Sequence, residues 1–152
     1  MISYATIRDK IRDHLMASGA FGSVDGHQPL GQPTSPVSVA VWAGPVDVSL
    51  YGSGLASTKL RLTVFATVYV PLEDPLDAVE ALVVDSVLTI MTLLHGDFDL
   101  GSTVECVDLL GAAGTPVGAQ LGYVRIDSRD YRTATVTIPI LLADVDDIPQ
   151  TP

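Results

Sequence analysis

Alternation of apolar and polar side chains is clearest in the middle of the chain, between Thr58 and Pro71. A period of two residues over this length predicts a β-strand with two different faces. One face holds Leu60, Leu62, Val64, Ala66, Val68 and Val70, and the other holds Arg61, Thr63, Phe65, Thr67 and Tyr69. At about 3.3 Å per residue the strand would reach roughly 46 Å, longer than the diameter of about 40 Å expected for a globule of this size. We therefore expect the strand to extend beyond its own domain, with its aromatic face available to another surface.

Two segments have helical periodicity. Ser3 can cap a helix whose apolar stripe is formed by Tyr4, Ile7, Ile11 and Leu15, and which ends near Ser18-Gly19. A second helix begins at Asp74-Pro75 and runs to about Leu94, and it should lie across the sheet as the second layer of the core. Its apolar side comprises Val79, Leu82, Val83, Val87, Ile90, Met91 and Leu94.

The remaining pattern adds short strands and loops. Residues 21–36 have no periodicity and predict a loop, and short strands follow at residues 37–42 and 46–50, which either pair with each other or continue as an extended arm. Residues 103–110 predict a strand with a bulge near Cys106-Val107, and residues 121–127 and 131–142 predict a closing hairpin. The fold class is therefore α+β, with a mainly antiparallel sheet packed by an N-terminal helix and one long helix, and with an extended loop or hairpin arm. Residues 1–143 form one domain and residues 144–152 an acidic flexible tail.

Composition suggests that part of the surface meets other proteins. Charged residues make up 17% of the chain and hydrophobic residues 47%, whereas an ordinary soluble domain has about 25% charged residues. Too few charges remain to cover the outside, so apolar surface is expected at subunit contacts. A membrane-spanning segment is not predicted, because Asp77, Glu80 and Asp85 interrupt the most apolar helix. A signal peptide is not predicted either, because the N-terminal sequence MISYATIRDKIRDHL lacks an apolar core. One cysteine excludes an internal disulfide framework.

The formal charge of −10 is concentrated in two stretches. Nine acids and no Lys or Arg lie between Arg61 and Arg125, and Asp144, Asp146 and Asp147 follow Arg132. Such a surface repels phosphate, which argues against sequence-specific binding of nucleic acid. The acids either serve solubility or keep passing DNA from adhering.

No pattern predicts catalysis, a metal site or a cofactor. Gly52-Ser53-Gly54 precedes a strand, whereas a nucleophile elbow requires a helix there. The segment His95-Gly96-Asp97-Phe98-Asp99 holds possible metal ligands but is better explained as a helix end, and His14 and His27 have no companion at ligand spacing. Cys106 is expected to be a small buried hydrophobe.

A series of local motifs in fixed order resembles the tail terminator, or tail completion, proteins of bacteriophages with long non-contractile tails, especially those of actinobacterial hosts. The motifs are GSGL (52–55), PLDAVEAL (75–82), GDFDL (96–100), VDLLGAAG (107–114), GY (122–123) and YRTATVTIPILL (131–142). Their order covers residues 4–143. The resemblance implies an α+β subunit without enzymatic activity that forms a hexameric ring, stops growth of the tail tube and joins the tail to the head.

The resemblance also implies partners and a location. The partners are further copies of the chain, the tail tube protein and a head–tail connector protein, with DNA passing through the bore, and the location is the head-proximal end of the virion tail after assembly in the host cytoplasm. Candidate interface residues are Tyr51, Gly52, Gly54 and Leu55 in a loop expected to order on assembly, Phe65 and Tyr69 on the long strand, and Arg125 and Arg132. Asp144, Asp146 and Asp147 are candidate bore residues.

Two other interpretations stay open on the sequence. One is a head–tail connector or another structural subunit of the tail. The other is an α+β domain that binds a small ligand or hydrolyses a substrate, with its site at the Gly52-Ser53-Gly54 loop or near His95.

Overall fold

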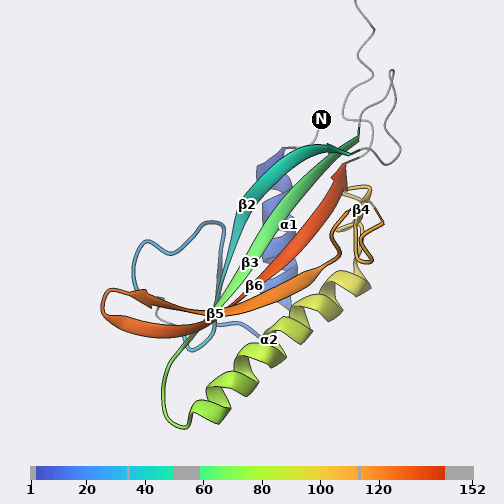
Figure 1. The fold of residues 1–152 in the computed structure, drawn as a ribbon. Coiled ribbons are helices and arrows are strands. Elements are labelled where there is room, and N and C mark those ends of the chain that lie inside the picture. The colour runs from blue at the N-terminus through green and yellow to red at the C-terminus, as the bar shows by residue number, and fades with distance from the viewer. Residues whose placement is uncertain (1–2, 34, 50–58, 113, 143–152) are drawn as a thin grey trace, which may run out of the picture.

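The computed structural model describes residues 3–33, 35–49, 59–112 and 114–142 (Figure 1). The loop residues Tyr51, Gly52, Gly54 and Leu55 and the bore candidates Asp144, Asp146 and Asp147 lie outside these ranges. The elements in chain order are α1 (Tyr4–Ala17), β1 (Ser23–Asp25), β2 (Ser38–Ser49), β3 (Lys59–Pro71), α2 (Leu76–Gly96), β4 (Cys106–Val107), β5 (Gly118–Ile126) and β6 (Arg129–Leu142).

All six strands belong to one sheet, in the order β1-β2-β3-β6-β4, with β5 also paired to β6. The β1–β2 pair is parallel and every other pair is antiparallel. Strand β6 lies inside the sheet and has the most partners, because β3 pairs with one of its edges and β5 and β4 pair with successive parts of the other. The predicted α+β class with a mainly antiparallel sheet is confirmed.

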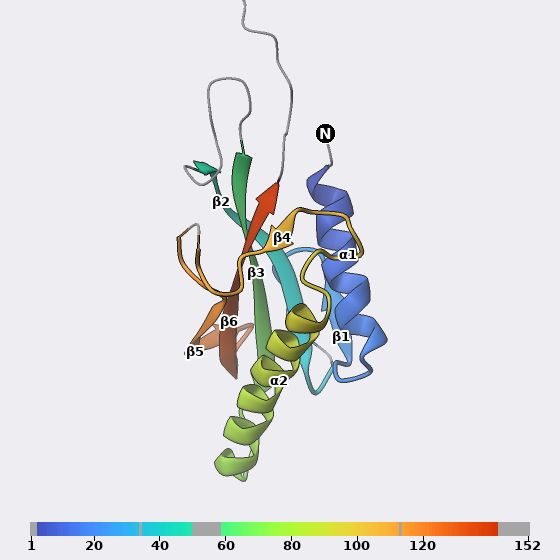
Figure 2. The ribbon, with the colours of Figure 1, turned by 90° about the vertical axis from the view of Figure 1, so that its right-hand side faces the viewer.

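Both helices pack on the same face of the sheet and form the second layer (Figure 2). The predicted aliphatic face of β3 is the core face: Val64, Ala66 and Val68 are fully buried, together with the alternating residues of β6 from Ala134 to Ile140. From the helices, Ile7, Ile11 and Leu15 of α1 and Val83, Ile90 and Leu94 of α2 complete this core.

Helix α1 begins and ends as predicted. The side chain of Ser3 accepts a hydrogen bond from the backbone N–H of Thr6 at 3.3 Å, and Gly19 has the left-handed φ of 71° that stops the helix. Helix α2 begins at Leu76, with Pro75 at the cap position. By length and composition α2 is apolar enough to cross a membrane, a test that the core helix of a soluble protein also meets, and 33% of its most apolar window is buried inside the fold.

The closing hairpin is tighter than predicted. Strands β5 and β6 are joined by only Asp127 and Ser128, and both residues have positive φ, at 47° and 68°. Two left-handed residues are the geometry of a type I′ turn, whose twist matches the twist of the paired strands. The turn is therefore made by two residues, and β6 begins at Arg129, two residues before the predicted start at residue 131.

Two predictions about short strands need correction, and one open alternative is decided. Residues 21–36 contain β1, which pairs with Ser38, Val39 and Ala40 of β2. Of the two alternatives for the segments around Gly44-Pro45, the structure shows the continuous one: they form the single strand β2, with a register shift between Ala43 and Val46, and do not pair with each other. Of the strand expected over residues 103–110 only Cys106–Val107 pairs in the sheet, since left-handed Leu100, Gly101 and Ser102 turn the preceding chain.

Candidate assembly surfaces

The residues considered for chemistry do not come together. His14 Nε2 lies 3.0 Å from the Leu93 carbonyl oxygen and His95 Nδ1 lies 2.7 Å from that of Met91, so both imidazoles contact backbone of α2. Asp97 accepts a hydrogen bond from the N–H of Gly101 at 2.9 Å. No group of three metal-ligating side chains occurs within the described ranges. Cys106 is half-buried rather than buried, and burial together with the carboxylates of Glu105 and Asp108 raises the pKa of its thiol, which disfavours the reactive thiolate.

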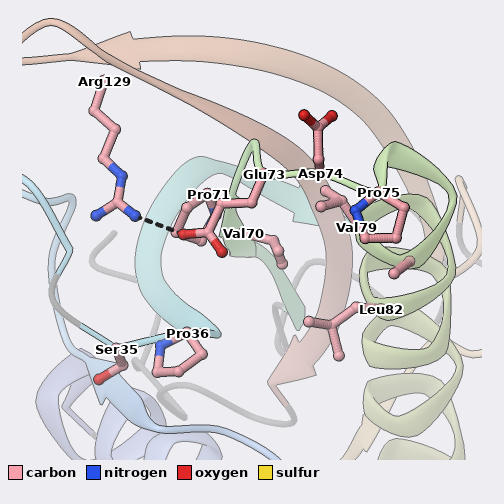
Figure 3. A pocket seen from close by; sticks show the side chains of 11 residues that line it. Ser35, Pro36, Val70, Pro71, Glu73, Asp74, Pro75, Val79, Leu82 and Arg129 are labelled. Carbon is pink, nitrogen blue, oxygen red and sulfur yellow. Dashed lines mark hydrogen bonds and ion pairs between the residues drawn. The ribbon is translucent and has the colours of Figure 1, made fainter.

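A cavity of about 390 Å³ lies where β3 leads into α2 (Figure 3). Val70, Val79 and Leu82 give it an apolar lining, and Arg129 crosses its rim to bind Glu73 at 3.0 Å. The carboxylate of Glu73 already neutralises the one basic group of the lining. The cavity therefore resembles a surface hollow between a strand end and a helix more than a site with several convergent polar groups.

Around Tyr69 the second face of β3 is buried within the chain, which corrects the expectation that Tyr69 is open to a partner. Tyr69 is only 7% exposed and packs edge-on against Tyr131, with ring centroids 6.4 Å apart. Ala40 completes this smaller core, and burial raises the pKa of the Tyr69 phenol. The loop that precedes β2 covers this face, since the Tyr131 hydroxyl lies 3.5 Å from the Pro33 carbonyl oxygen.

Phe65 is half-buried on the same face. Its ring lies 4.6 Å from that of Trp42, and the indole N–H of Trp42 donates to Thr67 Oγ1 at 3.0 Å. Gly44 passes so close to the Phe65 ring that a methyl group there would overlap it. Part of this aromatic pair remains accessible, so a role of Phe65 in contacts between subunits stays a prediction.

The two arginines proposed for subunit contacts have partners inside the chain. Arg125 Nε binds Asp130 Oδ1 at 3.0 Å across the hairpin. Arg132 donates two hydrogen bonds to Glu80 of α2, at 2.9 and 3.0 Å, and its guanidinium stacks on Tyr123 at 4.3 Å from the ring centroid. These bonds raise the pKa of Arg132 and lower the pKa of Glu80. Arg132 therefore fastens α2 to the β5–β6 hairpin.

Several acids that seemed unopposed along the sequence are paired in space. Glu73, Glu80 and Glu105 bind Arg129, Arg132 and Lys59 respectively, at 2.7 to 3.0 Å. Asp108 is buried, and it accepts a hydrogen bond from the N–H of Ala112 at 2.8 Å, so it is unavailable to solvent or a bore. Linear spacing could not show these pairs, because 46 to 56 residues separate the partners.

Exposed apolar side chains gather on surfaces that sequence reasoning did not single out. Val46 and Val48 near the end of β2 are 60% and 61% exposed, although the register places them on the helix-covered face. Val84 and Leu88 follow Ala81 along the outer side of α2, and Leu88 is 56% exposed. Both ribbon views show the first turns of α2 projecting beyond the strands (Figures 1 and 2). Tyr123 of β5 is 69% exposed. In the sequence, the pattern that could have pointed to the exposed apolar surface of β2 is the alternation of apolar and polar residues over positions 46–50.

Comparison with known proteins gives a limited result. No protein-family model matches the chain, and no curated protein matches it. A solved structure described as the sheath/tube terminator of an extracellular contractile injection system, PVC, in the extended state, matches with a TM-score of 0.46 and 13% sequence identity. The match covers 100% of this chain and 62% of that chain, so this chain corresponds to less than two thirds of the length of its neighbour. A likeness at this level assigns neither a family nor a function.

Proposed function

We propose that the chain is a structural subunit of a tail-like particle, which associates with copies of itself into a ring that ends the tail tube. The observation that carries the proposal is apolar surface left open on separate elements of a sparsely charged subunit, at Val46 and Val48 of β2 and at Val84 and Leu88 of α2. Exposed apolar patches of this kind are typical of protein contacts. The more specific part of the proposal, a tail terminator with a head-joining surface, rests on the resemblance of the ordered sequence motifs to tail terminator proteins.

Within this proposal the ring is a hexamer that contacts the tail tube protein on one side and a head–tail connector protein on the other. It is located in the virion, at the head-proximal end of the tail, and DNA passes through it without sequence-specific binding. The bore is lined partly by Asp144, Asp146 and Asp147, whose carboxylates offer phosphate no cation to replace its counterions. Replacing these three residues by Lys should slow DNA ejection and leave tail length unchanged. Ejection at the wild-type rate would indicate that the three acids serve solubility instead.

Electron microscopy of particles assembled without this protein tests the function. A terminator is required to stop polymerisation of the tube, so its loss should leave overlong tails without heads. Tails of normal length beside DNA-filled or leaking heads would instead indicate a connector. Mass measurement of the purified protein, alone and with tail tubes, separates both from the small-ligand alternative. A monomer that binds a small molecule and never associates with tubes would overturn the structural proposal.

A further inference from the structure

Two long strand edges have no partner within the described residues. β1 pairs only with the first three residues of β2, so residues 41–49 of β2 are paired on the β3 side alone. β5 pairs with β6 along all nine of its residues and with no other strand. Soluble proteins usually protect such edges with charges, prolines or very short strands. β5 has no proline and one charged residue, Arg125, whereas the open part of β2 carries Pro45 and Asp47 at or after a register shift, so β5 is the less protected edge of the two.

The direction of the strands allows these two edges to meet. β2, β3, β6 and β5 alternate in direction, so β5 runs opposite to β2. When two copies stand side by side with their strands in the same sense, β5 of one copy meets β2 of the next as an antiparallel pair. This head-to-tail contact occupies both edges of every subunit, whereas a two-fold contact would use one edge twice and leave the other open.

The side chains along the two edges also match. Val46 and Val48 lie opposite Leu62 and Leu60 of β3, and Leu121 lies opposite Ala134 of β6, so all three belong to the helix-covered face of the sheet. An antiparallel pair that sets Gly118 beside Ser49 places Ala119 beside Val48 and Leu121 beside Val46, and the register shift at Gly44-Pro45 then interrupts the one-to-one pairing. Small apolar pairs of this kind stabilise neighbouring strands.

From these observations we infer that β5 of one subunit adds to residues 41–49 of β2 in the next, so that one antiparallel sheet continues from subunit to subunit. The inference names the contact within the proposed ring and in this sense rests on the proposed function.

The pairing has a geometric consequence that suits closure into a ring. Through β6, Gly118 lies level with Phe65 of β3, whereas Ser49 lies level with Lys59, so pairing Gly118 with Ser49 shifts the next subunit by six residues along the strands. Six residues span about 20 Å, and four strands span about 19 Å across the sheet, which corresponds to a strand tilt of roughly 45°. Closed barrels have strand tilts of about 35–45°. The offset between the two edges is therefore close to the stagger that a closed sheet requires.

Cysteine cross-linking tests the contact. In a Cys106→Ser background, the variant Val46→Cys with Leu121→Cys should form a ladder of covalent multimers with copper–phenanthroline as oxidant. The two positions lie on strands separated by β3 and β6, so an intramolecular bond is excluded. The matched control is Val46→Cys with Val124→Cys, because Val124 and Leu121 are both 37% exposed but lie on opposite faces of β5. We expect roughly tenfold more multimer from the first pair, since directly opposite Cβ atoms lie about 4.5–5.5 Å apart.

The outcomes are distinguishable. Rings that form without a ladder, or with equal yields from both pairs, overturn the inference and leave the proposed function standing. Dimers from Val46→Cys or Leu121→Cys alone indicate a two-fold contact and also overturn it. Hydrogen exchange of the unmodified protein gives a second measurement, in which residues 41–49 and β5 should gain protection on assembly. If the protein remains monomeric with and without tail tubes, and these residues gain no protection, both the inferred strand pairing and the proposed ring are wrong.

Discussion

Single residues of β3 show that alternation identifies the two faces of a strand without revealing what covers each face. Val64 and Val68 were assigned to the core, and both are fully buried. Tyr69 was assigned to the opposite face correctly, but that face has its own small core with Tyr131, contributed by a strand about 60 residues later in the chain. A loop without periodicity covers it, and nothing in the sequence of that loop indicates where it folds.

Replacing Tyr69 by Ser should therefore destabilise the isolated subunit, by about 3–5 kcal/mol if the site behaves like other buried aromatic positions. Phe65→Ser should cost about half as much, because Phe65 is half-buried and loses mainly its contact with Trp42. Urea denaturation of the two variants measures the difference. Val64→Asp places an uncompensated carboxylate in the main core and should prevent folding altogether. Equal and small losses for Tyr69→Ser and Phe65→Ser would mean that the smaller core contributes little.

The ion pair between Glu80 and Arg132 should give stability a defined dependence on pH. The pKa of Glu80 is lowered by the hydrogen bonds from Arg132, so the pair contributes fully above the ordinary carboxylate pKa of about 4.3 and loses its contribution as the pH falls through the lower folded-state value. The stability difference between wild type and Glu80→Gln should be constant above pH ~5 and disappear in acid. Asp85→Asn is the matched control, since Asp85 lies exposed on the same helix with no ion pair within the described ranges. A difference that persists in strong acid would contradict the assignment.

At the scale of elements, both helices and the long strands could be predicted because each has a repeated apolar period with a chemical stop. Ser3 and Gly19 delimit α1, and Pro71 ends β3 as expected. The short β1 and β4 could not be predicted, because three and two residues are too few for a period, and their pairing with β2 and β6 is decided by the tertiary fold. The true length of β2 was hidden by Gly44-Pro45, a pair that normally signals a turn and here sits at a register shift on a free edge.

The turn between β5 and β6 permits a stabilising change. Ser128 holds a φ of 68°, which costs a residue with a Cβ about 1–2 kcal/mol. The substitution Ser128→Gly removes this cost, but glycine makes the unfolded chain more flexible, which lowers the free energy of unfolding by about 0.4–1 kcal/mol. We therefore expect the free energy of unfolding to rise by about 0.5–1 kcal/mol in total. Thermal unfolding measures it. Ser128→Val, which is β-branched, should lower the melting temperature, and a higher one would show that the turn has another geometry.

At the scale of the whole molecule, the sequence predicted too much free charge and, at Tyr69, assigned a buried side chain to the open surface. The acids of residues 73–108 were counted along the chain, but folding brings three of them to cations far away. The shortage of charges did predict apolar surface, which lies chiefly on β2, α2 and β5 rather than on Tyr69. Which elements remain uncovered depends on how sheet and helices overlap, and no local pattern contains that information.

The outer side of α2 provides a test of this surface. Leu88→Glu should leave a folded subunit, because the side chain is already 56% exposed, but should reduce association with other copies or with the tail tube. Thr92→Glu, one turn further along the same exposed side, is the control for added charge. Sedimentation of each variant with and without tubes compares them. Unchanged association of Leu88→Glu would exclude this side of α2 from the contacts.

The position of β6 inside the sheet has a consequence for synthesis of the protein. β6 is the last strand along the described chain, yet it separates β3 from β5, and 57 residues lie between the end of β3 and its beginning. At about 5–20 residues per second, a ribosome needs roughly 3–11 s to bridge that interval. During this time the edge of β3 that pairs with β6 lacks its partner, and open strand edges in a nascent chain are prone to aggregate. A chain interrupted before β6 lacks the strand that joins β3 to β5 and β4, so we expect incomplete products of translation to remain unfolded and to stay out of any assembly.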